Sequence, residues 1–569
     1  ERMAGLVVRQ AEFVKRTLAR LGAEKLFGAF YCYANLPANS ITHYAGGQDA
    51  HRIVLECRDL DYLSAPVGYS ARQPGGVSTA QMLPASAELA GKLYFAEDDT
   101  GTHLSGNPHN VLPADARQSV QMMTRGFLDV WRSGGTQWFM DLFGEGTYRD
   151  RTLMENVARL ADFAGRRMEQ RESTAQIAVF LSDRSLSCSK TFQFLTGSLI
   201  EQQLNEIAAI GASYDLFRIE DLPELVRRNR LKQYRFAIML NLHFLDGELR
   251  ELIDRELKKD HRSILWFHAP GLLRNGKFDA DGCFELTGIR CVLAGGQRSS
   301  LITEVLIDGK RFSYGTPRNV NPRLYGADPD AEALGWMVEG TWTPYRKGAD
   351  GAMLLEKHFP EWTSIWSASP NMPSALLGMF TERAGVHLYT SRGDQVFQSK
   401  QWLGVHCKWN GMLELHFPER GSWRDAFSGA LLVENGEETS RRYVTLPFSQ
   451  DLFEHSGNAS SLYLSFDIRR TDVALGGNNS VRAYAGFWFR YTAADAEGSV
   501  SNGDRGWYRR VTDAGFVSTD EDWVRIKLGP LDLSGFNAAS LRDFQIGINA
   551  ACEVTGTVQI RHILVEANS

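Results

Sequence analysis

The stretch "KLYFAEDDTGTHL", residues 92–104, runs a short apolar strand directly into three consecutive acids. Glu97, Asp98 and Asp99 repel one another, and burying their charges at the end of a strand is costly. On a scaffold of alternating strands and helices, acids at strand ends point into the ligand cleft. The stretch therefore predicts a β/α fold with a carboxylate site at the end of this strand.

Residues 1–172 repeat this β/α pattern. Apolar runs predict strands at 26–33, 60–65, 93–97 and 136–142, and helical periodicity marks residues 1–21, 120–130 and 153–168. Such units build an open doubly wound sheet or a (β/α)₈ barrel, and a whole barrel takes about 250 residues. Residues 1–172 hold four such units, which is half of a (β/α)₈ barrel. Side chains suited to chemistry stand at or just after the strand ends, namely Tyr31, Tyr33, Ser64, Tyr69, Glu97, Trp138 and Asp141.

A second α/β segment follows a polar boundary at residues 169–174. Its apolar runs at 176–181, 213–217, 234–240 and 263–267 are typical of buried parallel strands. The chain has neither a GxGxxG turn after the first of these strands nor a GxxxxGK[ST] loop, so a nucleotide site is unsupported. The pattern favours a flavodoxin-like scaffold.

The rest of the chain turns to β-structure. Short strands are expected at 385–390 and 412–417, and alternating apolar residues after about residue 430 predict a β-sandwich of jelly-roll type. The expected fold class is a multi-domain α/β protein. Its expected domains are a half-barrel at 1–172, a flavodoxin-like domain at 173–375, a small β-domain at 376–430 and a sandwich at 431–569.

Composition narrows the class of ligand. The 569 residues exceed one hydrophobic core, and a formal charge of −6 with mixed signs gives no footprint for nucleic acid or a membrane surface. Seven scattered cysteines without a CxxC pair argue against a disulfide framework or a structural zinc site, and favour reduced thiols in a cytoplasm. No run approaches the roughly 20 apolar residues of a membrane span. The apolar stripe of the predicted helix 1–21 is typical of the middle of a domain, so we expect further sequence upstream.

Glu97 has two interpretations. It is either a solvated or ion-paired acid at a strand end, or a carboxylate that faces an oxocarbenium-like sugar centre. Asp98 and Asp99 are expected to orient neighbours or to cap the loop. In "QWFMDLFGEGTYRD", residues 137–150, Trp138 beside Asp141 suits a pyranose, whose C–H face is apolar and whose rim is polar. The alternative is that Trp138 fills a core layer and Glu145 is a solvated acid of the turn.

Histidine and cysteine offer weaker candidates. His43, His103 and His109 lack the spacing of metal ligands, so ordinary hydrogen bonding is expected and no metal is predicted. Cys188 is flanked by serines rather than the glycines of a nucleophile elbow, so it is interpreted as structural.

These stretches resemble glycoside hydrolases of the family 42 β-galactosidase type. "LDYLSAPVGYSARQPGG" resembles the sixth barrel strand and its loop, "GKLYFAEDDTGTHL" the seventh, and "TQWFMDLFGEGTYRD" the eighth. The next domain resembles the family's trimerisation domain, and residues 384–429 resemble its small β-domain. The resemblance covers roughly residues 1–430. Gly101 departs from it, standing where close relatives carry an arginine.

The resemblance implies a retaining β-glycosidase with Glu97 as the nucleophile, without a metal or organic cofactor. The family's proton-donating Glu ends the fourth strand, which lies outside this sequence, so a complementing N-terminal half-barrel is implied, as is a homotrimer. The implied partner is an oligo- or polysaccharide substrate. Its implied contacts are Tyr31, Tyr33, Tyr69, Asp99, His103, Trp138, Asp141 and Tyr148.

Two rival functions stay open. The chain is a non-catalytic carbohydrate-binding or structural protein if half a barrel is never complemented. It is an amidotransferase-like hydrolase if Cys188 is a nucleophile. For the C-terminal sandwich, Trp507, Tyr508 and Trp523 suit either sugar stacking or a core.

Overall fold

The computed structural model divides into two compact units. Unit 1 comprises residues 1–294, 322–332 and 355–446, and unit 2 comprises residues 295–321, 333–354 and 447–569. The structure describes residues 1–31, 50–106, 112–188, 194–294, 299–320, 322–337, 351–408, 413–418, 423–427, 431–433, 443–446, 461–476, 485–493, 496–500, 524–532, 541–550 and 553–568.

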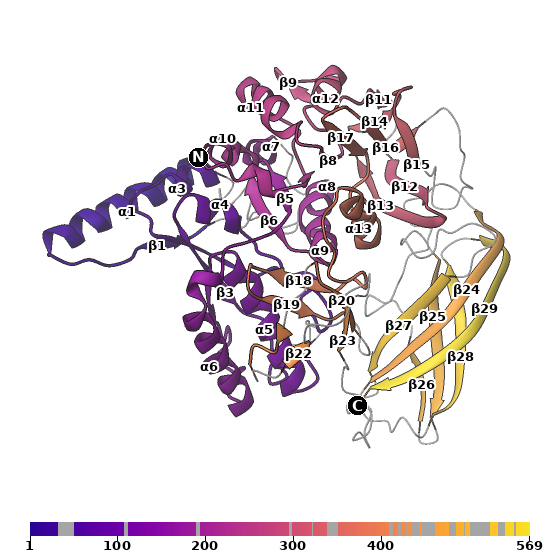
Figure 1. Cartoon of the computed structure of the whole chain (residues 1–569). Coiled ribbons are helices and arrows are strands. Elements are labelled where there is room, and N and C mark those ends of the chain that lie inside the picture. The colour runs from indigo at the N-terminus through magenta and orange to yellow at the C-terminus, as the bar shows by residue number, and fades with distance from the viewer. Residues whose placement is uncertain are drawn as a thin grey trace. The chain divides into compact units, whose positions relative to one another are not determined.

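Unit 1 begins with a four-stranded parallel sheet in chain order, β1-β2-β3-β4, of which Figure 1 labels β1 and β3. Its strands are β1 (Gly28–Phe30), β2 (Tyr62–Pro66), β3 (Leu93–Asp98) and β4 (Thr136–Phe139). The accompanying helices are α1 (Arg2–Arg20), α3 (His51–Leu55), α4 (Pro84–Leu89), α5 (Ala116–Arg132) and α6 (Arg151–Arg166). Sequential parallel strands separated by helices are the repetition that the sequence predicts.

The two faces of this sheet differ sharply. Residues paired in register on parallel strands share a face, and alternate residues along a strand change face. One face carries Leu63, Ala65, Tyr94 and Ala96, which join α1, α3 and α5 in a buried apolar cluster. The other face carries the aromatic residues Phe30, Tyr62, Phe95 and Trp138. Phe30 is 47% exposed and the other three are half-buried, so we call this second surface the open face.

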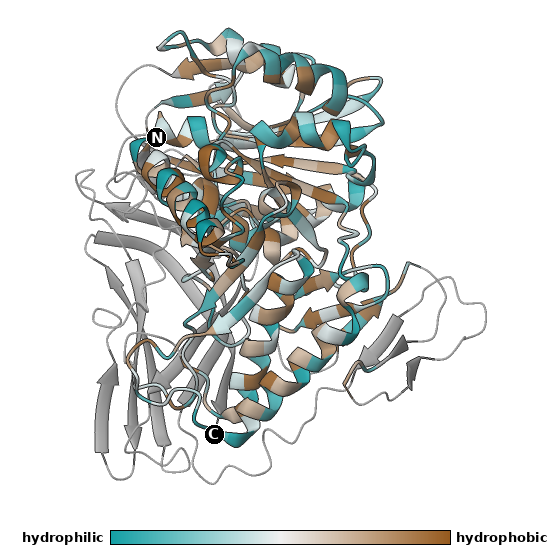
Figure 2. Ribbon diagram, turned by 90° about the vertical axis from the view of Figure 1, so that its left-hand side faces the viewer, coloured by the Kyte–Doolittle hydropathy of each residue, from teal (hydrophilic) through white to brown (hydrophobic). Residues whose placement is uncertain are grey.

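A second sheet follows, an 11-stranded mixed sheet whose parallel part has the order β6-β5-β7-β8-β17, the order of flavodoxin-like folds. Its strands are β5 (Ile177–Leu181), β6 (Tyr214–Arg218), β7 (Phe236–Met239), β8 (Arg262–Phe267) and β17 (Trp362–Ser367). Every residue of these five strands is buried except Thr363. Figure 2 shows the apolar residues concentrated along these strands and hydrophilic residues on the outer turns of the helices. Continuous apolar runs of this kind are what a parallel sheet covered on both faces requires.

Short helices connect the second sheet. The α-helices are α7 (Asp183–Ser187), α8 (Phe194–Gly197), α9 (Gln203–Ala208), α10 (Leu222–Arg227), α11 (Gly247–Leu252), α12 (Ala280–Thr287) and α13 (Ser374–Arg383). The 3₁₀ turns are η1 (Met168–Gln170), η3 (Ile219–Asp221) and η4 (Leu231–Gln233), and the π-helical turns are η2 (Ser198–Gln202) and η5 (Ile253–Leu257).

The remaining strands of unit 1 form small pairings. These are β9 (Leu273–Arg274) with β10 (Lys277–Phe278), β11 (Cys291–Ala294) with β14 (Arg323–Gly326), β18 (Gln395–Gln398) with β19 (Leu403–His406), β20 (Leu413–His416) with β23 (Tyr443–Leu446), and β21 (Trp423–Arg424) with β22 (Leu431–Val433). Strand β15 (Glu332–Met337) begins in unit 1 and continues in unit 2. Strand β16 (Ala352–His358) begins in unit 2 and continues in unit 1.

Unit 2 contains antiparallel structure in its described residues. Strand β12 (Ser299–Ile307) pairs with β13 (Lys310–Val320). Two three-stranded sheets follow, β27-β24-β29 and β26-β25-β28. Their strands are β24 (Ser461–Gly476), β25 (Ala485–Ala493), β26 (Ala496–Val500), β27 (Val524–Asp532), β28 (Leu541–Ala550) and β29 (Glu553–Asn568).

The α/β class with parallel sheets is confirmed, while one predicted strand is wrong. Residues 385–390 form no strand, because their backbone bonds go to two separate partners: Tyr389 N–H donates to Gly211 O, and Tyr389 O accepts from His416 N–H. The domain boundaries after residues 172, 375 and 430 stay predictions. Within the described residues, no helix combines the length and apolar character needed to cross a bilayer.

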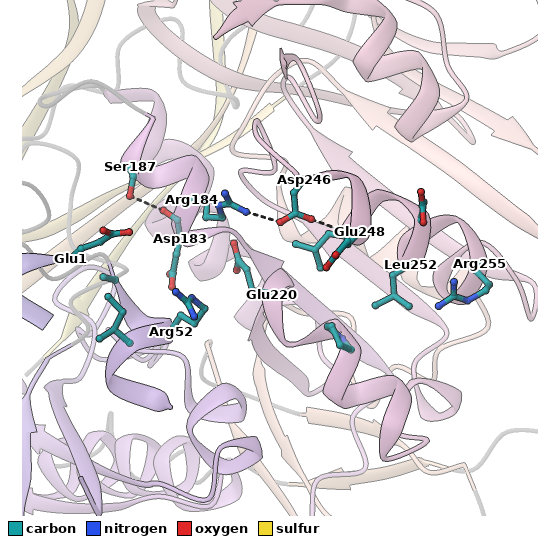
Figure 3. Close-up of a pocket in the computed structure, with 15 residues that line it drawn as sticks. Glu1, Arg52, Asp183, Arg184, Ser187, Glu220, Asp246, Glu248, Leu252 and Arg255 are labelled. Carbon is teal, nitrogen blue, oxygen red and sulfur yellow. Dashed lines mark hydrogen bonds and ion pairs between the residues drawn. The ribbon is translucent and has the colours of Figure 1, made fainter. Parts of the chain in front are cut away.

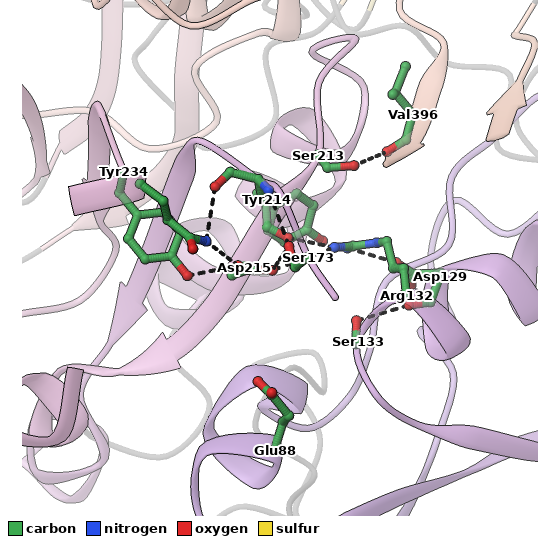
Figure 4. A network of polar contacts seen from close by, with 12 residues as sticks. Glu88, Asp129, Arg132, Ser133, Ser173, Ser213, Tyr214, Asp215, Tyr234 and Val396 are labelled. Atoms are coloured by element: carbon green, nitrogen blue, oxygen red, sulfur yellow. Dashed lines mark hydrogen bonds and ion pairs between the residues drawn. The ribbon is translucent and has the colours of Figure 1, made fainter. Parts of the chain in front are cut away.

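A buried polar network ties α5 to the second sheet (Figure 4). Arg132, 5% exposed, donates from Nη1 to Tyr214 O at 2.7 Å and from Nη2 to Asp129 Oδ1 at 3.0 Å. Its Nη1 lies 4.0 Å from Asp215 Oδ1. Asp215 also accepts hydrogen bonds from the Ser173 and Tyr234 hydroxyls, both at 2.8 Å. Arg132 therefore compensates two buried carboxylates on different elements.

We expect Arg132→Met to destabilise the protein by about 3–5 kcal/mol, because it leaves Asp129 and Asp215 buried without their cation. Urea unfolding followed by tryptophan fluorescence measures this loss. The matched control is Arg166→Met, which breaks the exposed ion pair with Asp162 and is expected to cost at most about 1 kcal/mol. Equal losses for the two variants would contradict the role assigned to Arg132.

Candidate active site

Glu97 lies at the carboxyl end of β3, on the open face of the first sheet. It pairs in register with Pro66 of β2 and Trp138 of β4. Two residues earlier, the Phe95 ring lies 6.4 Å from the Trp138 ring and 5.6 Å from the Tyr62 ring. Glu97 is only 9% exposed, and its carboxylate makes no hydrogen bond or ion pair to any described residue. An unpaired, nearly buried carboxylate thus stands beside an aromatic wall.

The electrostatics of Glu97 follow from this position. Burial raises the pKa of the Glu97 carboxyl above that of an ordinary glutamate, and the negative charge of Asp99 raises that pKa further. No neighbouring cation offsets either effect in the described residues. The ionised form of Glu97 is therefore held at a free-energy cost.

Asp98 points to the opposite side of the sheet. It is 2% exposed, and burial raises its pKa. Its carboxylate accepts a hydrogen bond from Thr100 N–H at 3.0 Å, so it caps the loop as the sequence suggested. A Cβ added at Gly126 of α5 would lie 3.1 Å from Asp98 Oδ2, which places Asp98 against the helix layer. Glu97 therefore lies on the open face of the sheet, and Asp98 lies against the helices on the other face.

Asp99 lines a cavity of about 430 Å³ beyond the ends of β3 and β4. It forms an ion pair with Arg72 at 2.7 Å, and the Arg72 guanidinium lies 5.0 Å from the centre of the Tyr69 ring. Both Arg72 and Tyr69 also line the cavity, opposite the turn that carries Glu145 and Thr147. A cavity with a cation, a carboxylate and an aromatic ring suits a polyhydroxylated ligand.

The other candidates after β4 organise the loops around this cavity. Asp141 accepts hydrogen bonds from the backbone N–H groups of Glu145, Gly146 and Thr147, which fixes the turn 141–147. The Tyr148 hydroxyl donates to Asp98 O at 3.0 Å and lies 3.2 Å from Thr100 O, so it secures the end of β3.

Two further candidates lie away from the cavity lining. His103 Nδ1 lies 2.9 Å from Ser119 Oγ on α5. Tyr31 is 1% exposed within the apolar cluster, and its hydroxyl accepts a hydrogen bond from Ala50 N–H at 3.3 Å. Their substrate contacts stay predictions. The candidates Tyr33, His43, His109, Trp507, Tyr508 and Trp523 lie outside the described residues.

Sequence reasoning missed Arg72. It stands in the loop after β2, six residues beyond the strand, where spacing alone gives no reason to pair it with Asp99. The available signal was the carboxyl-end rule: loops that follow adjacent parallel strands meet at one edge, so a cation in one loop can meet an acid in the next.

The described residues give no support to metal or thiol chemistry. No three of their His, Cys, Asp and Glu side chains gather as metal ligands. Cys188 is exposed at the end of α7, and desolvation raises the pKa of its thiol. A nucleophilic cysteine needs the opposite shift, so this site does not favour the amidotransferase interpretation.

No protein-family model matches the sequence, and no curated protein matches it. Solved structures with a similar chain course include a β-galactosidase from Bacillus circulans sp. alkalophilus, 11% identical with a TM-score of 0.45, where the alignment covers 72% of this chain and 67% of that one. A β-galactosidase from Halorubrum lacusprofundi is 12% identical with a TM-score of 0.45, over 68% of this chain and 60% of that one. The α-L-fucosidase isoenzyme 2 from Paenibacillus thiaminolyticus is 10% identical with a TM-score of 0.42, over 68% and 64%. Each TM-score is below 0.5, so functional assignment rests on the residues.

We expect Glu97→Gln to raise the melting temperature at pH 7 relative to the wild type. Because the folded-state pKa of Glu97 is raised, wild-type stability falls as the pH rises from the ordinary glutamate range through that pKa. The neutral variant avoids this loss, so its advantage shrinks on acidification toward pH 4. Thermal unfolding from pH 4 to pH 7.5 measures the difference. Glu145→Gln, at an exposed carboxylate, is the control, and an equal trend in both variants would refute the assigned cause.

Proposed function

We propose that this chain belongs to a retaining glycoside hydrolase that acts on a β-galactoside or a related β-glycoside, with Glu97 as its nucleophile. The observation that carries the proposal is the unpaired carboxylate of Glu97 at a strand end, beside the aromatic residues Phe95 and Trp138. Sugar rings stack on aromatic faces, and a retaining glycosidase needs a carboxylate aimed at the anomeric carbon.

In the proposed reaction, Glu97 attacks the anomeric carbon and the glycosidic bond breaks. A second carboxylic acid protonates the leaving oxygen, and the same group then activates water to release the sugar from Glu97. The two carboxyl groups of such a pair lie about 5–5.5 Å apart. In the proposal the second group is a glutamate outside residues 1–569.

The environment of Glu97 suits this step. Without a cation nearby, its negative charge is poorly stabilised in the free site. The oxocarbenium-like transition state develops positive charge at the anomeric carbon, which supplies the missing counter-charge. The interaction is therefore stronger in the transition state than in the free enzyme, which is the condition for catalysis.

Substrate binding is assigned to the groups around Glu97. Trp138 offers a ring for the apolar sugar face, and Asp99 and Tyr69 line the neighbouring cavity. Tyr31, Tyr33, His103, Asp141 and Tyr148 complete the proposed set. Within the described residues, Asp141 and Tyr148 contribute through the loops that they hold.

The open face supports a proposal about the fold. Phe30, Tyr62, Phe95 and Trp138 are the side chains that the interior of a closed barrel would bury. We infer that the first sheet is the second half of a (β/α)₈ barrel, completed by a further half-barrel from the same protein or a partner chain. The second sheet is proposed as a trimerisation-type domain of a homotrimer, residues 376–430 as a small β-domain, and residues 431–569 as a jelly-roll sandwich of carbohydrate-binding type. A cytoplasmic location is proposed from the cysteine usage.

One observation favours a second candidate, a non-catalytic carbohydrate-binding protein. On the described strands β1 to β4, Glu97 is the one carboxylate of the open face. Without a complementing half-barrel, the open face binds a sugar ring but offers no second carboxyl group as proton donor.

The test is hydrolysis of p-nitrophenyl β-D-galactopyranoside by the chain extended with its upstream residues. Glu97→Gln is expected to lower kcat at least 10³-fold, a loss of about 4 kcal/mol of transition-state stabilisation. An activated 2-deoxy-2-fluoro galactoside is expected to trap a covalent adduct on Glu97, located by peptide mass spectrometry.

Glu169→Gln is the control, because Glu169 is an exposed carboxylate that lines neither the cavity nor the open face. Undiminished turnover in Glu97→Gln would overturn the nucleophile assignment. Galactoside binding without turnover in the extended wild-type chain would favour the binding protein instead.

A further inference from the structure

A buried guanidinium holds the loop that forms one wall of the cavity beside Asp99. Arg125 of α5 is 3% exposed, and it donates from Nη2 to Arg72 O at 2.6 Å and from Nη1 to Gln73 O at 3.0 Å. Its other polar contact among the described residues is His406 Nε2, at 3.5 Å. Burying a cation is costly, and here the compensating hydrogen bonds come from two carbonyls of one loop. The loop that carries Arg72 is therefore fixed to α5.

The backbone of the same loop is also stabilised from within. Val77 N–H donates to Ala71 O at 2.7 Å, and Gly76 N–H donates to Gln73 O at 2.9 Å. A Cβ added at Gly76 would lie 1.9 Å from Ala71 O, so the close approach requires glycine. The Arg72 side chain thus enters the cavity from a backbone position with little freedom.

Arg72 places its charge directly on Asp99. Its Nη1 donates to Asp99 Oδ1 at 2.7 Å, and the side chains of Arg72 and Asp99 are 15% and 8% exposed. No other described residue donates a hydrogen bond to the Asp99 carboxylate. The far side of the guanidinium is covered by the Tyr69 ring, whose centre lies 5.0 Å away. Salt screens a pair with so little exposure only weakly, so the guanidinium offsets most of the Asp99 charge.

The charge of Asp99 matters because Glu97 is close. Two residues of chain span at most about 7 Å, which is within the roughly 8 Å Debye length at physiological salt. After burial, the charge of Asp99 is the effect that raises the pKa of Glu97, and no cation of the described residues lowers that pKa directly. Offsetting the charge of Asp99 is therefore the way in which this site favours ionised Glu97.

We propose that Arg72 is a positioning residue for the reaction of Glu97: it holds the Asp99 carboxylate in the cavity wall and offsets its charge, so that Glu97 stays ionised for attack on the sugar. The inference rests on the proposed glycosidase function. Within the described residues no hydrogen bond or ion pair joins Arg72 to Glu97, so Arg72 acts through Asp99.

Other titratable groups surround this pair from several elements. Asp98 of β3 is 2% exposed and points to the helix side of the sheet. The remaining groups are Arg125 of α5, His103 of the loop after β3, and Asp141, Glu145 and Tyr148 after β4. Among the described groups, Asp99 is the one whose charge shifts the pKa of Glu97. The pH dependence expected below is therefore assigned to the Arg72–Asp99 pair.

The experiment measures kcat/KM against pH for p-nitrophenyl β-D-galactopyranoside, with the chain extended by its upstream residues. Arg72→Met leaves the charge of Asp99 without its cation, so the acidic limb of the profile, which reports ionisation of Glu97, is expected to move to higher pH. Asp99→Asn removes that charge and is expected to move the limb to lower pH. Arg72→Lys keeps the cation and is expected to bring the limb back toward its wild-type position. A purely structural role of Arg72 would lower kcat/KM alike at every pH.

The matched control is Arg184→Met. Figure 3 shows Arg184 paired with Asp246, at 2.6 Å, in the wall of a separate cavity of about 730 Å³. The Arg184 guanidinium lies 4.9 Å from the centre of the Phe244 ring, so the arrangement repeats that of Arg72. The two cavities share no lining residue. Arg184→Met is therefore expected to leave the acidic limb in place.

A second measurement needs no turnover and separates this inference from the proposed function. The gain in melting temperature on Glu97→Gln at pH 7 reports the cost of holding Glu97 ionised. This gain is expected to be larger in Arg72→Met than in the wild type, and smaller in Asp99→Asn. If both changes appear and the extended wild-type chain shows no turnover, the glycosidase proposal fails and the role of Arg72 stands. An unchanged gain in Arg72→Met, or an acidic limb that stays in place, refutes the role of Arg72.

Discussion

The arrangement of unit 1 depends on one buried guanidinium. Arg132 ends α5, a helix of the first sheet, and holds Asp129 on its own helix and Asp215 on β6 of the second sheet. Without this guanidinium, both carboxylates would lie buried with no ion-pair partner, which would cost several kcal/mol. The contact thereby links α5 of the first sheet to β6 of the second. The candidate active site lies at the carboxyl ends of strands in the first sheet.

Acidic side chains in the two sheets fall into two kinds of environment. Some carboxylates are well supplied with donors: Asp215 accepts hydrogen bonds from two hydroxyls and has the Arg132 guanidinium 4.0 Å away, and Asp141 accepts from three backbone N–H groups. Glu97 is an exception. Acids left without donors in an otherwise well-satisfied interior are candidates for ligand contacts.

Part of this could be predicted from the sequence. The apolar run before Glu97 predicted β3, because a short run of apolar residues is a local signal for a buried strand. Successive side chains of a strand point to opposite faces, which separates Asp98 from Glu97. Residues 385–390 alternate equally well, yet Tyr389 bonds to Gly211 and His416 rather than to a neighbouring strand. A strand forms only beside a partner strand, and the sequence of residues 385–390 does not show whether one is available.

The candidate active site was harder to predict, because it joins distant segments. Arg72 meets Asp99 across two loops, which no spacing rule connects. Only the order of the strands brings these two loops to one edge of the sheet.

The open face has a practical consequence for handling the protein. Phe30 and Trp138 expose ring surface on a sheet whose outer strand, β1, has free backbone groups along one side within the described residues. Uncovered aromatic sheets with a bare edge recruit other chains into intermolecular β-structure. Within the described residues, the open face therefore combines exposed aromatic ring surface with an unpaired strand edge, and we expect the protein to associate as its concentration rises.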